Sequence, residues 1–279
     1  MKKRYLFLTL IVLLIIGAIA IQFRPRAVVS RSLQNISNLK TAHVVINIGI
    51  ANSAATQQLL GEEGAVNLII DGQYDKQTSG SDNMAANINL SISTESVSVT
   101  INGDVRLIDD KIYLLVKKAP AALPILEQFK GRWISFDRTV QNIKQPNPTP
   151  FTDLFTTVDQ QGIAKINKQT TIHYSLQATN QAVIQFMNSI ANILGSSLSH
   201  DQLQALQSDI ATNTSLPVDI YVGLWRNNIR QITSQLQVSG GNDIKLTMLI
   251  DEPNQPVEMV APQAITIEDL VNQSAVGAK

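Results

Sequence analysis

The sequence predicts an α+β fold rich in strands, in which an antiparallel sheet is covered by a few helices and preceded by one N-terminal apolar helix. Three observations carry this prediction. An unbroken apolar run follows basic residues at the N-terminus, most later segments alternate apolar and polar residues, and a few segments repeat apolar residues at helical spacing. Antiparallel pairing is expected because short connections join the strand segments.

The first 26 residues form a segment of their own. Three basic residues at 2–4 precede an apolar run at 5–21, and Arg24 and Arg26 follow it. As a helix the run would be about 25 Å long, at the short end of what crosses a bilayer. The denser positive charge before the run predicts a cytoplasmic N-terminus and a body outside the cytoplasm. The membrane is therefore a predicted partner.

Two interpretations of this segment are open. As a signal anchor it stays in the cell membrane and makes the chain a single-pass membrane protein. As a signal peptide it is cleaved near Ala20, where Ala18 and Ala20 supply small residues, and the body is secreted. The length of the apolar run favours the anchor. Both interpretations place the body outside the cytoplasm.

Composition excludes several classes of protein. Lys and Arg together number 22, as do Asp and Glu, so the net charge is zero and no nucleic-acid partner is expected. The absence of cysteine excludes disulfides, thiolate metal sites, cysteine nucleophiles and a lipid-modified N-terminal cysteine. Hydrophobic residues make up 44% of the chain, enough for a core.

Residues 27–265 are predicted to form about ten strands with period-two alternation. The segments of the first half are Val44–Ile50, Val66–Ile70, Ile88–Ile92, Val97–Ile101, Ile112–Val116 and Trp133–Phe136. Those of the second half are Ile172–Leu176, Val218–Leu224, Ile232–Val238 and Ile244–Ile250. Turns are expected at 102–104, 109–110, 227–228 and 240–242, where Asn, Gly and Asp gather.

The covering helices are expected at 28–39, 120–129, 180–194 and 199–211, and residues 266–279 form a tail. Pro146, Pro148 and Pro150 exclude a regular helix or central strand around them. Residues 138–160 are therefore predicted to be an exposed loop with a short helix near 151–158. This loop is also a candidate boundary between two domains.

The order of predicted helices and strands in several stretches of the chain matches that of one known superfamily. These stretches are Leu33–His43, Val105–Leu114, Pro120, Gly131–Ile134, Tyr174–Leu176 and Pro217–Val222. In this order the chain resembles the bacterial lipid- and lipoprotein-carrier superfamily, which includes the LolA and LolB carriers and the mycobacterial LppX and LprG lipoproteins. The resemblance implies a curved antiparallel half-barrel closed by helices, with an apolar cavity that takes acyl chains. The superfamily's lipoproteins carry a lipid-modified cysteine, so here either the apolar helix replaces that anchor or only the fold is shared.

No catalytic or cofactor motif is found, and no enzyme activity or cofactor is predicted. His43, His173 and His200 are isolated from one another, and neither a nucleophile elbow nor a phosphate loop occurs. We therefore predict a protein that binds or carries a lipid acyl chain; the alternative is a non-enzymatic cell-surface interaction or scaffold domain with a fully packed core. The predicted cavity lining combines aliphatic strand faces with aromatic residues: Ile46, Ile48, Leu68, Ile70, Leu90, Val99, Tyr113, Trp133, Phe136, Tyr174, Ile220, Val222, Leu246 and Met248.

Overall fold

The computed structural model describes residues 25–51, 62–77, 82–120, 124–137, 154–179, 182, 216–224, 227–238, 242–266 and 269. Within these residues the chain forms one sheet of 12 strands and two helices, α2 (Pro25–Ser37) and α4 (Pro124–Gln128). The predicted helices at 180–194 and 199–211, the proline-rich loop and the C-terminal tail fall almost entirely outside the described residues.

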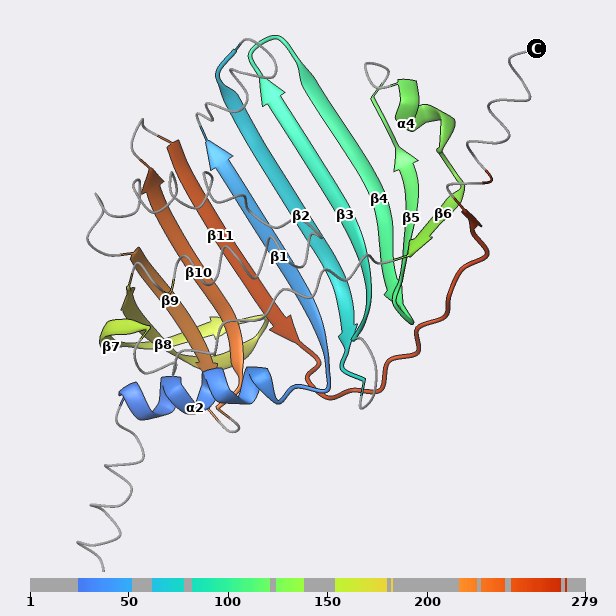
Figure 1. Ribbon diagram of the computed structural model, residues 1–279. Helices are drawn as coiled ribbons and strands as arrows, with labels where there is room; N and C mark the ends of the chain where they lie inside the picture. The colour runs from blue at the N-terminus through green and yellow to red at the C-terminus, as the bar shows by residue number, and fades with distance from the viewer. Residues whose placement is uncertain are drawn as a thin grey trace, which may run out of the picture.

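The sheet consists of two antiparallel meanders (Figure 1). The first contains β1 (Thr41–Ala51), β2 (Gly64–Asp75), β3 (Asn83–Thr94), β4 (Ser98–Ile108), β5 (Lys111–Lys118) and β6 (Trp133–Asp137). The second contains β7 (Phe155–Ile166), β8 (Gln169–Ala178), β9 (Leu216–Gly223), β10 (Ile229–Val238) and β11 (Asn242–Asp251). Pairing of β1 with β11 joins the two, giving the order β12-β6-β5-β4-β3-β2-β1-β11-β10-β9-β8-β7.

The register places the apolar residues of neighbouring strands side by side. Ile46 of β1 lies opposite Met248 of β11 and Ile70 of β2, and Ile70 in turn lies opposite Ile88 of β3. Because side chains alternate between the faces of a sheet, this register collects the aliphatic residues on one face. The opposite face carries most of the intervening Asn, Asp, Ser and Thr residues, together with a few apolar ones such as Ile69.

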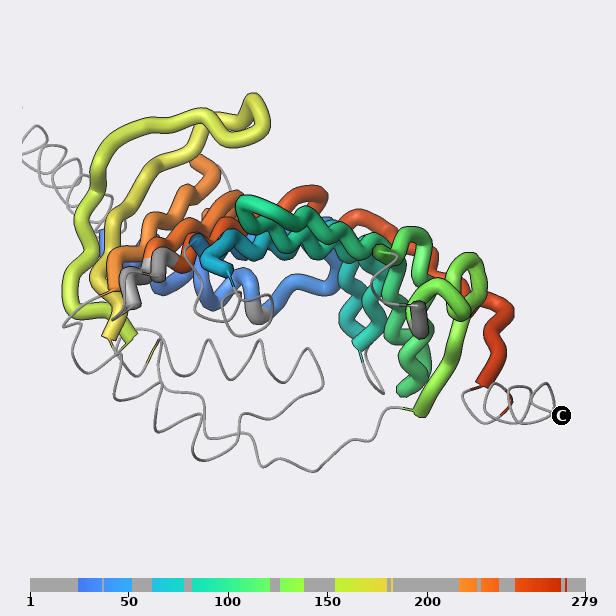
Figure 2. Tube along the Cα trace, turned by 90° about the horizontal axis from the view of Figure 1, so that it is seen from above, coloured from blue at the N-terminus to red at the C-terminus, as the bar shows by residue number. Residues whose placement is uncertain are grey.

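The sheet is curved, and α2 lies on its concave side (Figure 2), across the ends of β9 and β10 (Figure 1). Because the helix packs there against Tyr174 and Ile220 of the apolar face, the apolar face is the concave one. At the start of α2, Arg26 donates a hydrogen bond from Nη2 to the carbonyl oxygen of Phe155 at 3.0 Å. This bond fixes the start of the helix to β7. The helix is thus held to the second meander.

Glycines within the strands allow neighbouring strands to approach closely, and Gly72 and Gly103 are two examples. A Cβ atom at Gly72 would lie 2.4 Å from the Cβ of Ala86, and one at Gly103 would lie 2.4 Å from the carbonyl oxygen of Leu115. Both glycines lie on the concave face, opposite Ala86 of β3 and Val116 of β5 respectively. Such absent side chains permit the curvature that an ordinary strand pair would resist.

The segment after β11 crosses the molecule along one end of the sheet (Figure 1). The backbone amide of Asn254 donates to the carbonyl oxygen of Thr41 at 2.7 Å, and Arg106 Nη1 donates to the carbonyl oxygen of Val260 at 2.7 Å. The segment ends in β12 (Ile265–Thr266), which pairs in parallel with β6. The tail predicted from residue 266 therefore begins inside a strand.

The structure confirms most of the predicted strands and corrects two details. The short helix expected at 151–158 is wrong from residue 155 onward, because Phe155 begins β7. Two register shifts in β7 explain the error, since each extra residue breaks the alternation that identifies a strand. The turn expected at 102–104 lies inside β4, whereas the turn at Asp109 and Asp110 is confirmed by their positive φ angles of 51° and 62°.

The predicted N-terminal membrane segment at 5–21 lies outside the described residues. Among the residues that the structure describes, no helix combines the length and apolar character needed to cross a bilayer.

Candidate functional site

The candidate site is the concave face of the sheet, and 12 of the 14 predicted lining residues share it. The register separates the remaining two. Leu114 and Ile112 of β5 face the concave side with their partners Ile134 and Phe136, so Tyr113 and Trp133 face the convex side. There, the guanidinium carbon of Arg106 lies 4.9 Å from the centre of the Trp133 ring. Tyr113 and Trp133 therefore do not line the same surface as the other twelve.

One end of the concave face is closed by α2. Val28, Val29 and Leu33 of the helix pack in one cluster with residues of β8 to β11, and Tyr174 and Ile220 in this cluster are each 1% exposed. A crevice at the helix end, between Ile36 and Pro253, has a volume of about 10 Å³, which is room for about one water molecule. This part of the face is a packed core.

The remainder of the face is aliphatic but only half-buried, on β1 to β4 and also at Leu246 and Met248 of β11. Its side chains on β1 to β4 are Ile46, Ile48, Ile50, Val66, Leu68, Ile70, Ile88, Leu90, Ile92, Val99 and Ile101. Cross-strand partners extend it without a polar interruption, as in the row of Ile48, Leu68, Leu90 and Ile101. Burial of apolar side chains is the main favourable term in folding, so a large aliphatic surface left half-buried is the most unusual feature of this face.

A polar pair ends the aliphatic face on β2. Tyr74 continues the alternation of Leu68 and Ile70 and lies between Ala42 and Met84 in the register. Its hydroxyl donates a hydrogen bond to Oδ2 of Asp82 at 2.5 Å. Sequence reasoning missed this pair, although extending the period of β2 by four residues beyond Ile70 would have placed Tyr74 on the apolar face.

Burial and the neighbouring Asp82 raise the pKa of Tyr74 well above its usual value. The phenol therefore stays protonated at physiological pH and remains the donor of this hydrogen bond. Asp82 accepts it with one carboxylate oxygen, which leaves further acceptor sites on the group.

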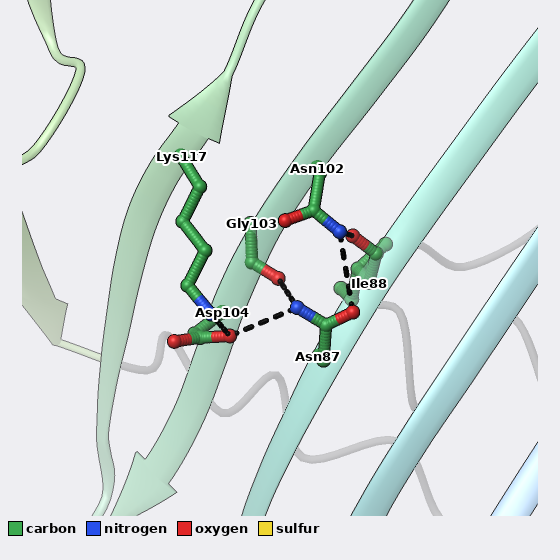
Figure 3. A network of polar contacts seen from close by, with 6 residues as sticks. All are labelled: Asn87, Ile88, Asn102, Gly103, Asp104 and Lys117. Atoms are coloured by element: carbon green, nitrogen blue, oxygen red, sulfur yellow. Dashed lines mark hydrogen bonds and ion pairs between the residues drawn. The ribbon is translucent and has the colours of Figure 1, made fainter.

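The convex face carries a network of polar side chains instead (Figure 3). Asp104 Oδ1 accepts hydrogen bonds from Asn87 Nδ2 at 3.0 Å and from Lys117 Nζ at 2.7 Å. Asn102 Nδ2 donates to Asn87 Oδ1 at 3.2 Å, which links β3 to β4. The network satisfies polar groups along the strands and presents a hydrophilic surface.

Both described histidines pair with aspartates on the convex face. His43 Nε2 lies 2.7 Å from Asp71 Oδ1, and His173 Nε2 lies 2.9 Å from Asp219 Oδ1. His173 also stacks on Tyr221, with ring centres 4.6 Å apart. Within the described ranges no three His, Asp or Glu residues come close enough to hold a metal ion. These pairs cross-link strands on the side away from the apolar face.

Comparison with known proteins places the fold. No family model matches the chain, and no curated protein sequence matches it at a significant level. The structure of LprF from Mycobacterium bovis is similar, with a TM-score of 0.51 and 12% identity over 85% of this chain and 96% of LprF. That of the lipoprotein LppX from Mycobacterium tuberculosis gives a TM-score of 0.45 and 14% identity over 84% and 97%.

The chain therefore shares the fold of LprF, in agreement with the carrier-like half-barrel that the order of its elements predicted. At this level of identity the similarity describes the fold alone. The evidence for function has to come from the surfaces of this chain.

Proposed function

We propose that this protein is a non-enzymatic carrier or binding protein that holds the acyl chain of a lipid against its concave face. The half-buried aliphatic surface of β1 to β4 is the observation that carries this proposal. A packed interaction domain would bury these side chains as fully as it buries those under α2. A lipid-binding protein instead leaves apolar surface for its ligand to cover.

The dimensions of this surface fit an acyl chain. From Val44 to Ile50 the concave face extends about 20 Å along the strand, because a strand rises about 3.4 Å per residue. One leaflet of a bilayer has a hydrocarbon depth of about 15 Å, half of the roughly 30 Å core. Each CH₂ group moved from water onto the protein contributes about 0.8 kcal/mol, so a bound chain would be held without any specific polar contact.

We further propose that the predicted N-terminal segment tethers the body to the outer side of the cell membrane. Helix α2 begins at Pro25, directly after the predicted apolar run and its basic flank, and Arg26 is bonded to Phe155 at the start of β7. A membrane helix ending near residue 21 would therefore keep the body within a few residues' reach of the bilayer. A short distance to the membrane suits a protein that exchanges lipids with it.

Native mass spectrometry with lipid extraction tests the proposal. The protein is purified from a lipid-containing host as a chain that starts at residue 25, which keeps α2 whole. A lipid that co-purifies in a fixed stoichiometry supports the carrier. A lipid-free protein that also takes up no fluorescent acyl probe would contradict it and favour a packed interaction domain at the cell surface.

A further inference from the structure

The polar pair Tyr74–Asp82 lies at the end of the surface on which the proposed acyl chain would rest. Tyr74 shares its register row with Met84 of β3, Leu107 of β4 and Ile112 of β5, all apolar. The phenol hydroxyl and the carboxylate of Asp82 thus adjoin an apolar row. A lipid has the same order of groups, because its head follows directly on its chains.

We propose that Asp82, positioned by Tyr74, selects lipids whose head group donates hydrogen bonds, such as the hydroxyls of a glycerol or sugar, over lipids with a phosphate at that position. This inference rests on the proposed function, since it assigns the polar end of the same site.

The argument for a donor head group comes from the chemistry of the pair. A carboxylate accepts hydrogen bonds and donates none, and within the described part of the chain the hydrogen bond from Tyr74 uses Oδ2 and leaves Oδ1 as an acceptor. A hydroxyl of the ligand would donate to Oδ1. A phosphate would bring a second negative charge next to it, and like charges at close range repel.

The hydrogen bond from Tyr74 fixes where the carboxylate points. The bond joins the phenol hydroxyl on the concave face to Oδ2 of Asp82 and so ties the carboxyl group to that face. Asp82 follows the loop between β2 and β3, so without this bond its side chain would turn freely toward solvent. Tyr74 is therefore a positioning residue, and Asp82 is the residue that meets the ligand.

Lys40 and Lys76 are exposed at the same end of the sheet, where the backbone amide of Lys76 donates to the carbonyl oxygen of Lys40. Their charge acts in favour of an anionic head. The contribution of Asp82 is consequently measured as the change in head-group preference on its substitution, with the lysines left in place.

Photo-crosslinking in vesicles tests the inference on the full chain. The chain is reconstituted in phosphatidylcholine vesicles with one of three probes that carry the same photoreactive acyl chain. The probes are a monoacylglycerol, its phosphate ester and an alkane without a head group. Crosslinks to peptides of β1 to β4 are quantified for the wild type, Asp82→Asn, Tyr74→Phe and Asp71→Asn.

We expect the wild type to prefer the monoacylglycerol over its phosphate ester by about tenfold or more, the lower end of what one hydrogen bond to a charged group contributes. Asp82→Asn should remove this preference and Tyr74→Phe should reduce it. Asp71→Asn is the matched control, because it removes the same charge from the convex side of β2, where Asp71 contacts His43. Thermal melts establish that each variant is folded.

The outcomes separate the two proposals. The inference about the head group is overturned if the wild type shows no preference, or if Asp82→Asn keeps the wild-type preference. In either case, crosslinking of the alkane to the concave face would still support acyl binding. Absence of crosslinking by the alkane to β1–β4 in the wild type overturns the acyl site itself.

Discussion

The two meanders of the sheet have the same alternation of apolar and polar residues and yet end in different environments. On β8 and β9 the apolar face packs in one cluster with α2, and side chains such as Leu176, at 0% exposure, are fully buried. On β1 to β4 the corresponding face stays half-buried at residues such as Leu68 and Leu90. Alternation in a strand therefore specifies which face is apolar, and the element packed against that face determines whether its side chains are fully buried or half-buried.

The packed region should carry most of the stability of the fold. Leu176→Ala should lower the free energy of unfolding by about 2–5 kcal/mol, because it leaves a cavity in a closed core. Leu90→Ala, on the half-buried surface, should cost about 1 kcal/mol or less, since its side chain gives up less buried area. Urea unfolding of the two variants measures the difference. Equal losses would show that both regions are packed alike.

Curvature should depend on the close contact at Gly72. Gly72→Ala should destabilise the fold by about 1–3 kcal/mol, because the new methyl group would lie 2.4 Å from the Cβ of Ala86. Gly49→Ala is the matched control on the neighbouring strand, since a Cβ there meets nothing within 4 Å. The control should be neutral or stabilise by up to about 1 kcal/mol through the unfolded chain. A neutral Gly72→Ala, measured by the same urea unfolding, would show that the strands adjust.

The sequence predicted the fold well where alternation is unbroken. The strands from 44 to 101 and from 218 to 250 were found because their apolar residues keep a period of two. β7 was missed because its two register shifts hide that period. The Asn102-Gly103-Asp104 stretch has the composition of a turn, but the structure uses Gly103 for a close approach to the carbonyl oxygen of Leu115 inside β4.

The candidate site was predicted less completely, for reasons of geometry. Trp133 and Phe136 are three positions apart on one strand and so face opposite sides, a conclusion that strict use of the strand period would have reached. The contribution of α2 is harder to predict. Its apolar stripe shows that it covers a strand face, but only the tertiary structure shows that it covers the second meander and leaves β1 to β4 half-buried.

The two faces of β2 offer a matched test of acyl binding. Leu68 lies on the concave face and Ile69, next to it and of equal size, lies on the convex face opposite Asn47 and Asn89. Leu68→Ala should weaken binding of a fluorescent acyl probe about three- to tenfold, because it removes apolar contact with the chain. Ile69→Ala should leave the affinity unchanged. An equal effect of both variants would mean that loss of stability, and not loss of contact, weakens binding.

The smallest expected effect is on stability at alkaline pH, and it distinguishes the tyrosines of the two regions. Burial raises the pKa of both Tyr174, in the packed core, and Tyr74, on the half-buried face, above the usual value of 10.0, and Asp82 adds to the rise at Tyr74. The folded protein therefore holds these protons more tightly than the unfolded chain does. Below about pH 10 the stabilisation is fully present, and it is lost progressively as the pH rises above that value, because the unfolded chain ionises first.

The urea midpoint of the wild type should accordingly fall between about pH 9 and about pH 11. The urea midpoints of Tyr74→Phe and Tyr174→Phe should fall less over this interval than that of the wild type, since each variant lacks one titrating group. The difference from the wild type should be larger for Tyr74→Phe, because the negative charge of Asp82 opposes ionisation of Tyr74. If the urea midpoint of Tyr74→Phe falls as steeply as that of the wild type, the hydroxyl of Tyr74 ionises equally well in the folded and unfolded chain. Its hydrogen bond then does not hold Asp82 in place.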